Sequence, residues 1–314
     1  MRNNPVNLSQ ERRHIEPLVS VLVPSYNHEQ YVVECLESIK DSNHKRLELI
    51  LSDDCSTDHT YALSKEWAQR NASRFERVVT VRQDINLGIV KNLQFLFENA
   101  QGEYLAYLAS DDMLTPSGIT DRLEVFEEDG DVDAVFGNSQ LISESGSVLR
   151  EQFLAANIAK AFISKKLLLC ALLRFWGPGG PVMMLRRTAI QEHGSLGILS
   201  DDLQFEDRYI YIRMASQGKL RFVNRVVARY RVVGKSMSRS TTFSTVARQG
   251  VLNSDQKNRH LLTGIDRLFL EMEIAKSDIE INMHAGAAYM LKKQFWRITS
   301  GLLWRAIYIR RRFS

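Results

Sequence analysis

The stretch Tyr104–Pro116, with the sequence YLAYLASDDMLTP, decides the fold because it joins a buried strand to a pair of acidic residues. Tyr104–Ala109 is an apolar run of strand length that ends abruptly, one residue before Asp111 and Asp112. Two adjacent carboxylates at the end of a buried strand are costly unless positive charge meets them. Mg²⁺ and Mn²⁺ take carboxylate oxygens together with substrate phosphate oxygens. The stretch therefore indicates a metal–diphosphate site; the alternative is an aspartate that only caps the helix after Pro116.

Upstream of this stretch, apolar runs of strand length alternate with segments of helical spacing. The expected strands are 18–23, 47–51, 78–81 and 104–109, and the expected helices are 28–40, 60–69 and 89–99. This alternation predicts an α/β fold with a mostly parallel, doubly wound sheet. Right-handed crossovers bring the carboxyl ends of such strands to one edge, where ligands bind. We expect four residues to converge there: Tyr26, Asp54, Arg82 and Asp111.

The second half of the chain predicts a change in character near residue 240. Before it, we expect strands at 134–142, 182–185 and 220–232 and helices at 119–128, 155–175 and 205–216. After it, the strand signals stop and the pattern is helical. The predicted organisation is a flexible lead-in over 1–17, an α/β domain over 18–240 and a helical region over 241–314.

The composition is that of an ordinary globular protein of 314 residues, with 44% hydrophobic and 25% charged residues. Three scattered cysteines predict no disulfide framework, and the polar N-terminus predicts no secretory signal, so we expect a cytoplasmic protein. No apolar run is long enough to predict a membrane span. The absence of G-x-G-x-x-G and G-x-x-x-x-G-K-[ST] argues against a dehydrogenase or a P-loop enzyme.

Six short motifs between about Val19 and Ser238 resemble those of the family 2 glycosyltransferases, which are inverting enzymes with a GT-A fold. In chain order they are VSVLVPSYN at 19–27, SDDCSTD at 52–58, NLG at 86–88, SDD at 110–112, ED at 206–207, and YR at 230–231 with SMS at 236–238. Each motif is weak alone, but six in the expected order are specific. The resemblance implies that the domain over 18–240 is a GT-A glycosyltransferase domain.

The resemblance implies a site for a nucleotide-sugar donor. Pro24 and Tyr26 would line the nucleobase pocket, and Asp54 would accept a hydrogen bond from the base. Arg82 would lie near the base or the diphosphate. Asp111 would hold the ribose and, together with Asp112, a divalent metal ion, Mn²⁺ or Mg²⁺, on the diphosphate.

The resemblance also implies the catalytic residue and the stereochemistry. Asp207 would be the general base that takes the proton from the acceptor hydroxyl as its oxygen attacks the anomeric carbon. A single displacement gives inversion, so no covalent nucleophile is needed. Further contacts with the acceptor or the diphosphate are expected from Trp176, Glu206, Arg231 and Lys235.

Structural alternatives stay open for most of these residues. Asp53 and Asp54 are also typical of loop amide binding and Asx turns. Glu206 and Asp207 also suit an ordinary charged first turn of a helix. The remaining alternatives are a solvated surface arginine at 82, a core tryptophan at 176 and a plain turn at 177–181.

Two departures from the family pattern bear on the metal. Ala109 stands where many members have a further aspartate, and Val233 stands where many have a metal- or phosphate-binding histidine. Valine cannot ligate, so metal binding would depend on the two aspartates, or Lys235 would supply positive charge to the diphosphate. A third alternative is a catalytically degenerate member that binds a glycan or a nucleotide.

The C-terminal segment Lys292–Phe313 is basic and contains no acidic residue. On a helix, its apolar side chains form one stripe, and Trp304 falls on the polar side. An amphipathic helix of this kind with an exposed tryptophan indicates association with an anionic membrane surface. The alternative is a helix that docks on the catalytic domain with a solvated basic face. No motif predicts a nucleic-acid partner.

Together these features predict an inverting transferase that moves a sugar, from a UDP-sugar above other donors, to a hydroxyl of a glycan or lipid-linked acceptor. We expect a role in bacterial cell-surface polysaccharide synthesis, on the cytoplasmic side of the membrane. The less favoured alternative enzyme is a sugar-phosphate nucleotidyltransferase, which needs a glycine-rich triphosphate loop after the first strand. Pro24–Asn27 does not supply one.

Overall fold

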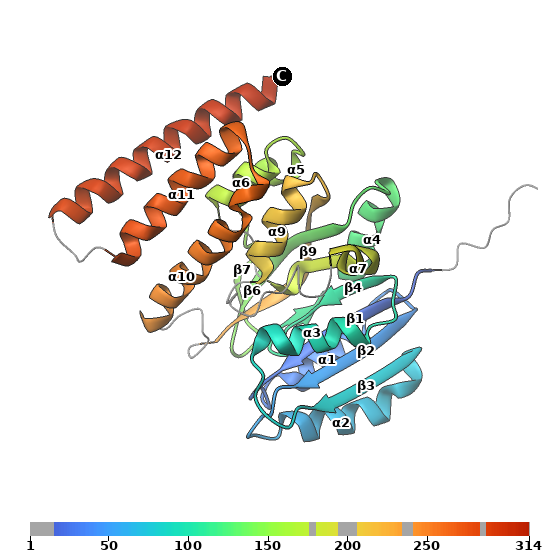
Figure 1. The fold of residues 1–314 in the computed structure, drawn as a ribbon. Coiled ribbons are helices and arrows are strands. Elements are labelled where there is room, and N and C mark those ends of the chain that lie inside the picture. Colours follow the sequence, from blue (N-terminus) through green and yellow to red (C-terminus); the bar gives the residue numbers. More distant parts are fainter. Residues whose placement is uncertain (1–15, 176–179, 194–205, 234–240, 283–286, 314) are drawn as a thin grey trace, which may run out of the picture.

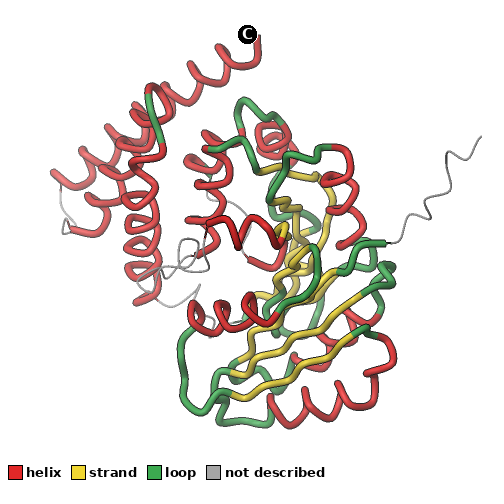
Figure 2. The backbone as a smooth tube through the Cα atoms, turned by 45° about the vertical axis from the view of Figure 1, so that its right-hand side comes forward, coloured by secondary structure: helices red, strands yellow, loops and turns green. Residues whose placement is uncertain are grey.

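The computed structural model describes residues 16–175, 180–193, 206–233, 241–282 and 287–313. Its centre is a mixed sheet with helices on both faces, and three long helices from the C-terminal part of the chain pack at one end (Figure 1). Figure 2 shows the strands running side by side between the helical layers.

The helices and strands follow the order expected from the sequence. The strands are β1 (Val19–Ser25), β2 (Leu47–Asp53), β3 (Arg77–Arg82), β4 (Tyr104–Tyr107), β5 (Met113–Leu114), β6 (Ala134–Ser143), β7 (Val148–Arg150), β8 (Met183–Arg186) and β9 (Leu220–Val232). The helices are α1 (Val32–Lys40), α2 (Thr60–Asn71), α3 (Ile89–Asn99), α4 (Gly118–Glu128), α5 (Ala156–Ile163), α6 (Leu168–Arg174), α7 (Arg187–His193), α9 (Glu206–Ser216), α10 (Thr241–Asn258), α11 (Gly264–Asn282) and α12 (Ala287–Phe313).

The sheet is parallel in its first half and mixed in its second. The strand order is β3-β2-β1-β4-β8-β6-β9-β5, with β7 paired to β6. The pairs among β1, β2, β3 and β4 are parallel, which confirms the predicted doubly wound unit. Strand β8 runs antiparallel to both β4 and β6, whereas β9 runs parallel to β6. The prediction of a mostly parallel sheet therefore holds for the first four strands.

Alternating side chains of the central strands build a separate core on each face of the sheet. Val21 and Leu49 point toward α1, α2 and α4, whereas their neighbours Leu22 and Ile50 point toward α3, α5, α6 and α9. Both sets are buried, which explains why these strands appear in the sequence as continuous apolar runs.

One predicted element is wrong. The segment 155–175 was expected as a single helix, but it forms α5 and α6 with a break after Ile163. Ser164 ends α5 with an extended backbone, and Lys165 reaches out to Asp129 with its ammonium 2.7 Å from the carboxylate. The polar residues Ser164–Lys166 at the break were compatible with a single helix in the sequence, so they did not reveal it.

The C-terminal region is helical, as predicted, and it packs on the α/β part. Phe269 of α11 and Ile307 of α12 are buried in the same core as Leu22 of β1. Trp304 does not lie exposed on a polar face, which corrects the prediction: its ring meets Phe175 edge-on, with centroids 5.1 Å apart. The domain boundary near residue 240 stays a prediction.

Candidate active site

The carboxyl ends of the first four strands lie at one edge of the sheet. The amide of Asp54, just after β2, donates to the carbonyl of Ser25 at 2.8 Å. The amide of Ser110, just after β4, donates to the carbonyl of Pro24 at 3.3 Å. These hydrogen bonds join the loops after β1, β2 and β4, and the buried Pro24 and the exposed Tyr26 lie at their junction.

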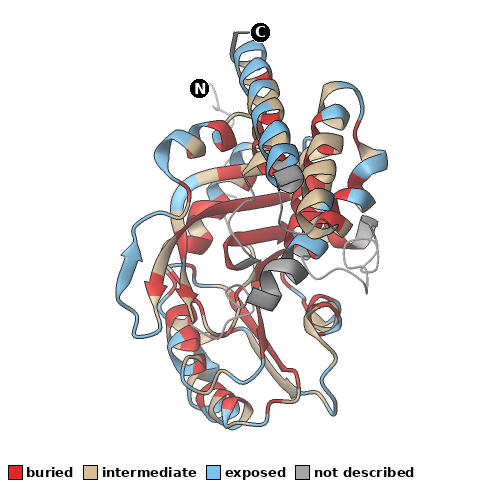
Figure 3. Ribbon diagram, turned by 90° about the vertical axis from the view of Figure 1, so that its left-hand side faces the viewer, coloured by how far each residue is buried: buried red, intermediate tan, exposed pale blue. Residues whose placement is uncertain are grey.

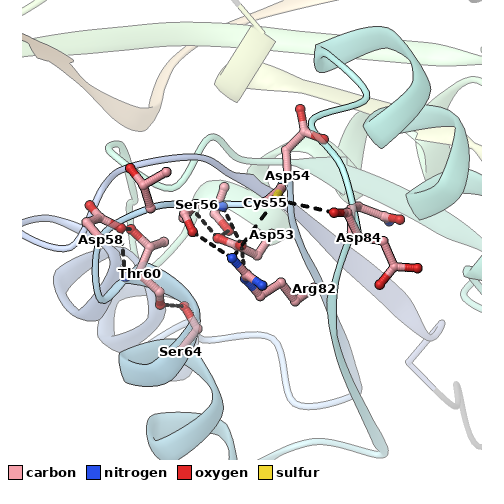
Figure 4. A network of polar contacts seen from close by, with 12 residues as sticks. Asp53, Asp54, Cys55, Ser56, Asp58, Thr60, Ser64, Arg82 and Asp84 are labelled. Carbon is pink, nitrogen blue, oxygen red and sulfur yellow. Dashed lines mark hydrogen bonds and ion pairs between the residues drawn. The ribbon is translucent and has the colours of Figure 1, made fainter.

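Asp53, the last residue of β2, holds the loop that follows this strand through its side chain. Its buried carboxylate accepts hydrogen bonds from the amide and the hydroxyl of Ser56 at 2.9 and 2.5 Å (Figure 4). The guanidinium of Arg82 lies 3.7 Å from it and donates to the Ser56 carbonyl at 2.9 Å. Since the Arg82 side chain is 46% exposed, it holds this loop and still faces the open edge.

Asp54 points the other way, toward the start of α3 (Figure 4). Its two carboxylate oxygens accept hydrogen bonds from the amides of Leu87 and Gly88 at 2.7 and 2.9 Å. A carboxylate has about four acceptor positions, so one further donor could still be accommodated. The expected contact with a nucleobase stays a prediction, and the described role is to fasten the loop before α3.

The two adjacent aspartates after β4 have different environments. The Asp112 carboxylate is buried, and its Oδ1 accepts a hydrogen bond from the amide of Arg231 at 2.8 Å. Burial, and then the neighbouring Asp111 charge, raises the pKa of Asp112 well above its usual range. The Asp111 side chain is 18% exposed and faces the ring of His28, with Oδ2 3.8 Å from Nε2.

Whether Asp111 and Asp112 can bind a divalent cation depends on which of their carboxylate oxygens are not already used in hydrogen bonds. The Asp112 Oδ2 atom is buried and has no hydrogen-bond partner within the described residues, and the Asp111 carboxylate is partly open. In the same ranges, no three acidic, histidine or cysteine side chains are grouped closely enough to hold an ion by themselves. The pair therefore fits an ion that takes its other ligands from a diphosphate and water.

His28 is a site residue that the sequence did not single out. Its Nδ1 lies 2.8 Å from the Ser110 hydroxyl, and its backbone amide donates to the Thr60 hydroxyl at 2.7 Å. The ring therefore stands beside the Asp111 carboxylate. Its place directly after the turn that ends β1, at the same edge as Asp111, was the available signal.

Arg231 lies inside the protein rather than at an open surface. Its guanidinium donates to the carbonyls of Asp111 and Glu144, both at 2.8 Å, and to the Glu34 carboxylate at 2.6 Å. It also stacks on the Tyr31 ring, 4.9 Å from the centroid. These contacts clamp the loop after β4, and they lend no support to the predicted contact with a diphosphate.

Asp207 lies in the first turn of α9, which packs between β9 and the helices α6 and α10. Its Oδ1 accepts a hydrogen bond from the amide of Arg208 at 2.7 Å. Burial raises the pKa of Asp207 to about 6, against the lowering effects of that amide and of the Arg208 charge. A carboxyl group with a pKa near neutrality suits a general base.

Several predicted residues fall outside the described part of the chain. They are Trp176, Lys235 and the side chain of Glu206. Val233, at the position where the family often has histidine, is described and half-buried.

Comparisons with known proteins place these features in a family. The sequence profile of glycosyl transferase family 2 matches residues 20–194, which is more than half of the chain. The chain is 35% identical over 113 residues to the Bacillus subtilis glycosyltransferase TuaG, covering 36% of this chain and 43% of TuaG. It is 27% identical over 225 residues to an uncharacterized glycosyltransferase of Haemophilus influenzae, covering 71% and 68% of the two chains. The chain thus spans less than half of TuaG.

Solved structures share the fold at low sequence identity. The S. aureus TarS fragment 1–349 superposes with a TM-score of 0.62 at 15% identity, covering 92% of this chain and 80% of that fragment. The mannosyltransferase PcManGT of Pyrobaculum calidifontis, solved with GDP-Man and Mn²⁺, gives 0.60 at 16% identity, covering 95% and 87%. With the strand edge and its carboxylates described above, these matches lead to one conclusion: the chain belongs to glycosyl transferase family 2 and has a GT-A fold.

Proposed function

We propose that this chain is an inverting, divalent-cation-dependent glycosyltransferase. It moves a sugar, from a UDP-sugar above other donors, to a hydroxyl of a glycan or lipid-linked acceptor in bacterial cell-surface polysaccharide synthesis. The observation that carries the proposal is the partly open Asp111 carboxylate at the edge where the loops after β1, β2 and β4 meet. The names of relatives support the donor and the pathway class: TuaG is named for teichuronic acid, and TarS was solved with UDP-GlcNAc.

The reaction is a single displacement in which each residue has one task. Asp207 accepts the proton of the acceptor hydroxyl, whose oxygen forms a bond to the anomeric carbon from the side opposite the diphosphate. The bond from that carbon to the diphosphate oxygen breaks, and the nucleoside diphosphate leaves. Asp111 and Asp112 would hold a divalent cation, Mn²⁺ or Mg²⁺, which supplies positive charge to the leaving diphosphate when bound. Pro24, Tyr26, Asp54 and Arg82 would line the donor site.

The first test is donor hydrolysis. The protein is incubated with UDP-, GDP- and dTDP-sugars and Mn²⁺ or Mg²⁺, with and without a chelator. We expect slow release of one nucleoside diphosphate, which the chelator and the Asp111→Ala substitution both abolish. Asp131→Ala removes an exposed carboxylate on the turn before β6 and serves as the matched control.

Two outcomes would contradict the proposal. If no nucleotide is released and none binds by calorimetry, the chain is not this enzyme. If a nucleotide binds but Asp207→Asn changes no rate, the degenerate binding module is the better account.

We also propose that α12 binds an anionic membrane surface, on the cytoplasmic side, where lipid-linked acceptors would be found. Five apolar side chains on its outer face are 50–71% exposed: Leu291, Phe295, Ile298, Leu302 and Ile309. Their spacing places them on one side of the helix, which we call the apolar stripe. Figure 3 shows α12 exposed along much of its length.

Charge favours an anionic lipid surface over other occupants of the apolar stripe. The exposed basic residues Lys292, Arg305 and Arg310 flank it, and the helix contains no acidic residue. Basic residues at the border of an inserted apolar face strengthen binding to anionic lipids by about 1 kcal/mol each. The binding would be to the surface, since none of the helices in the described ranges is long and apolar enough to cross a bilayer.

Co-sedimentation with vesicles tests this surface. We expect binding to phosphatidylcholine vesicles that contain phosphatidylglycerol, weaker binding at high salt, and loss of binding in Ile298→Ser/Leu302→Ser. Leu268→Ser removes an exposed leucine of α11 and should bind as wild type does. Equal sedimentation of wild type and the double variant would contradict the proposal. If light scattering shows that wild type is a dimer and the double variant a monomer, the apolar stripe binds a second copy of the chain instead.

A further inference from the structure

We propose that Asp255 of α10 is a positioning residue for catalysis, because it holds Arg208 and thereby fixes Asp207 at the start of α9. The inference rests on the proposed function, in which Asp207 is the general base. It assigns the C-terminal helices a part in the catalytic apparatus, in addition to any role at a membrane.

The Arg208 guanidinium is held on two sides in the interior. Its Nε and Nη2 donate to the two carboxylate oxygens of Asp255 at 2.7 and 2.9 Å, with side chains 4% and 1% exposed. Its Nη1 donates to the Leu172 carbonyl of α6 at 3.1 Å. A bidentate pair of this kind fixes both the position and the orientation of the planar guanidinium.

The fixed guanidinium controls the residue next to it. Asp207 precedes Arg208 in the first turn of α9, and its Oδ1 accepts the Arg208 amide at 2.7 Å. The same face of α10 makes a second contact one turn later, where Asn258 Nδ2 donates to the Tyr209 carbonyl at 3.3 Å. Helix α10 therefore contacts the first turn of α9 at two points, the Arg208 side chain and the Tyr209 carbonyl.

The charge of the Arg208–Asp255 pair is better explained by an effect on the general base Asp207 than by a gain in folding stability. A buried ion pair is weak evidence for stability, because apolar side chains of similar volume often join two helices equally well or better. The Arg208 charge does something that apolar packing would not, since it opposes the effect of burial on the pKa of Asp207. The charged groups around the pair are Asp207 of α9, Glu273 and Lys276 of α11, and Arg174 of α6, which lies 3.8 Å from the Glu273 carboxylate.

The test replaces the pair without breaking the packing. In Arg208→Met/Asp255→Leu, we expect a melting temperature close to that of wild type, because no buried charge is left unpaired. We expect kcat/KM for transfer to fall by about tenfold or more, because small displacements of a catalytic group are costly. The acid limb of the pH–rate profile should move upward by about one pH unit, because Asp207 has lost the cation that favours its ionised form.

A second ion pair in the same helical region supplies the matched control. Arg311 Nη2 of α12 donates to both carboxylate oxygens of Asp266 of α11 at 2.9 Å, so an arginine–aspartate pair, 23% and 22% exposed, joins two helices other than α9. We expect Asp266→Leu/Arg311→Met to leave the acid limb and kcat/KM of transfer unchanged.

The outcomes separate the inference from its premise. A wild-type acid limb and wild-type kcat/KM in Arg208→Met/Asp255→Leu would overturn it and leave the pair a purely structural link. If that variant does not fold, Arg208→Lys is the second test, because lysine keeps the positive charge but cannot make the two parallel hydrogen bonds to Asp255. We expect kcat to fall while the acid limb of the pH–rate profile stays in place. An unchanged kcat would equally overturn the inference. Failure of Asp207→Asn to reduce transfer would instead refute the proposed function.

Discussion

At the scale of single residues, the acidic side chains of the site differ in what they bind. Asp53, Asp54 and Asp112 accept hydrogen bonds from backbone amides of neighbouring loops and strands. Asp111 keeps a partly exposed carboxylate beside His28. Carboxylates that accept amides rigidify a site, whereas a carboxylate left open is free to bind a cation or a substrate.

This division predicts unequal effects of two adjacent substitutions. We expect Asp111→Asn to weaken Mn²⁺-dependent binding of UDP by about tenfold or more, because it removes the open ligand. Asp112→Asn should have a smaller effect, because Asp112 offers the cation only its Oδ2 atom, and it should not lower the melting temperature, since the amide oxygen can still accept the Arg231 N–H. Calorimetric titration of both variants decides this, and the reverse ranking would contradict it.

The raised pKa of Asp207 predicts the pH dependence of transfer. The base acts in its ionised form, so below its pKa of about 6 the rate should fall by about tenfold for each pH unit. Measurement of kcat/KM from about pH 5 to about pH 8 would reveal this fall in rate. A profile that is flat across pH 6 would contradict the assignment of Asp207 as the base.

The same pKa predicts that Asp207 costs stability. Its folded pKa lies above that of an unfolded aspartate, so its contribution to stability is present at acid pH and is lost as the pH rises through about 6. We expect Asp207→Asn to be more stable than wild type above pH 7, by about 1–3 kcal/mol, while transfer is lost. Denaturant unfolding at pH 5 and at pH 8 measures this difference, which should shrink at the lower pH.

At the scale of helices and strands, the site is built by short connections that fasten one element to the next. The Asp54 carboxylate joins the end of β2 to the loop before α3, and Gly88 in that loop has a φ of +79°, a left-handed value that favours glycine. The loop is therefore held by two amide hydrogen bonds to a single carboxylate.

Asp54→Asn should weaken this connection. The asparagine oxygen can accept an amide, but its NH₂ group cannot. Either the Leu87 amide would lose its partner, or the Gly88 amide would keep only its hydrogen bond of 3.1 Å to Asn86 Oδ1. We expect a loss of about 1–3 kcal/mol in the free energy of unfolding, with faster hydrogen exchange at both amides. Asp84→Asn, which changes an exposed carboxylate nearby, is the control. Unchanged exchange at both amides would contradict the prediction.

Much of this architecture could be predicted from the sequence. The four parallel strands were predicted because β1, β2 and β4 are buried apolar runs and β3, a half-buried edge strand, still carries three valines. Parallel pairing then places their ends together. The different roles of Asp111 and Asp112 could not be predicted, because they depend on Arg231, which lies about 120 positions later. The break between α5 and α6 and the orientation of Trp304 likewise depend on which distant surface each residue packs against.

At the scale of the whole molecule, the C-terminal helices and the α/β part share one core. Phe269 and Ile307 are buried in the same core as residues of β1 and α9, and Asp255 balances the buried Arg208 charge. The apolar stripe of α12 lies on the side of the helix that faces away from this packing.

Removal of the C-terminal helices should therefore prevent folding. In a chain that ends at residue 240, the faces of α6 and α9 that pack on α11 and α10 would be exposed to water, and the core would lose Phe269 and Ile307. Folded domains are stabilised by only about 5–15 kcal/mol, so the loss of this buried apolar surface is large on that scale. We expect an insoluble product without a cooperative unfolding transition. A soluble fragment that melts near the wild-type temperature would show instead that residue 240 bounds an independent domain.

The contacts between α10 and α9 also limit where this chain can be joined to a relative in a chimeric protein. The match to the family profile covers residues 20–194 and ends ahead of α9, so it stops before the proposed base. A chimera that joins the first half of this chain to the second half of a relative must bring both partners of the Asp255–Arg208 pair from the same parent. A junction between α9 and α10 would separate them. The second half of a relative would therefore be grafted most readily as one block that begins before Glu206 and includes α10.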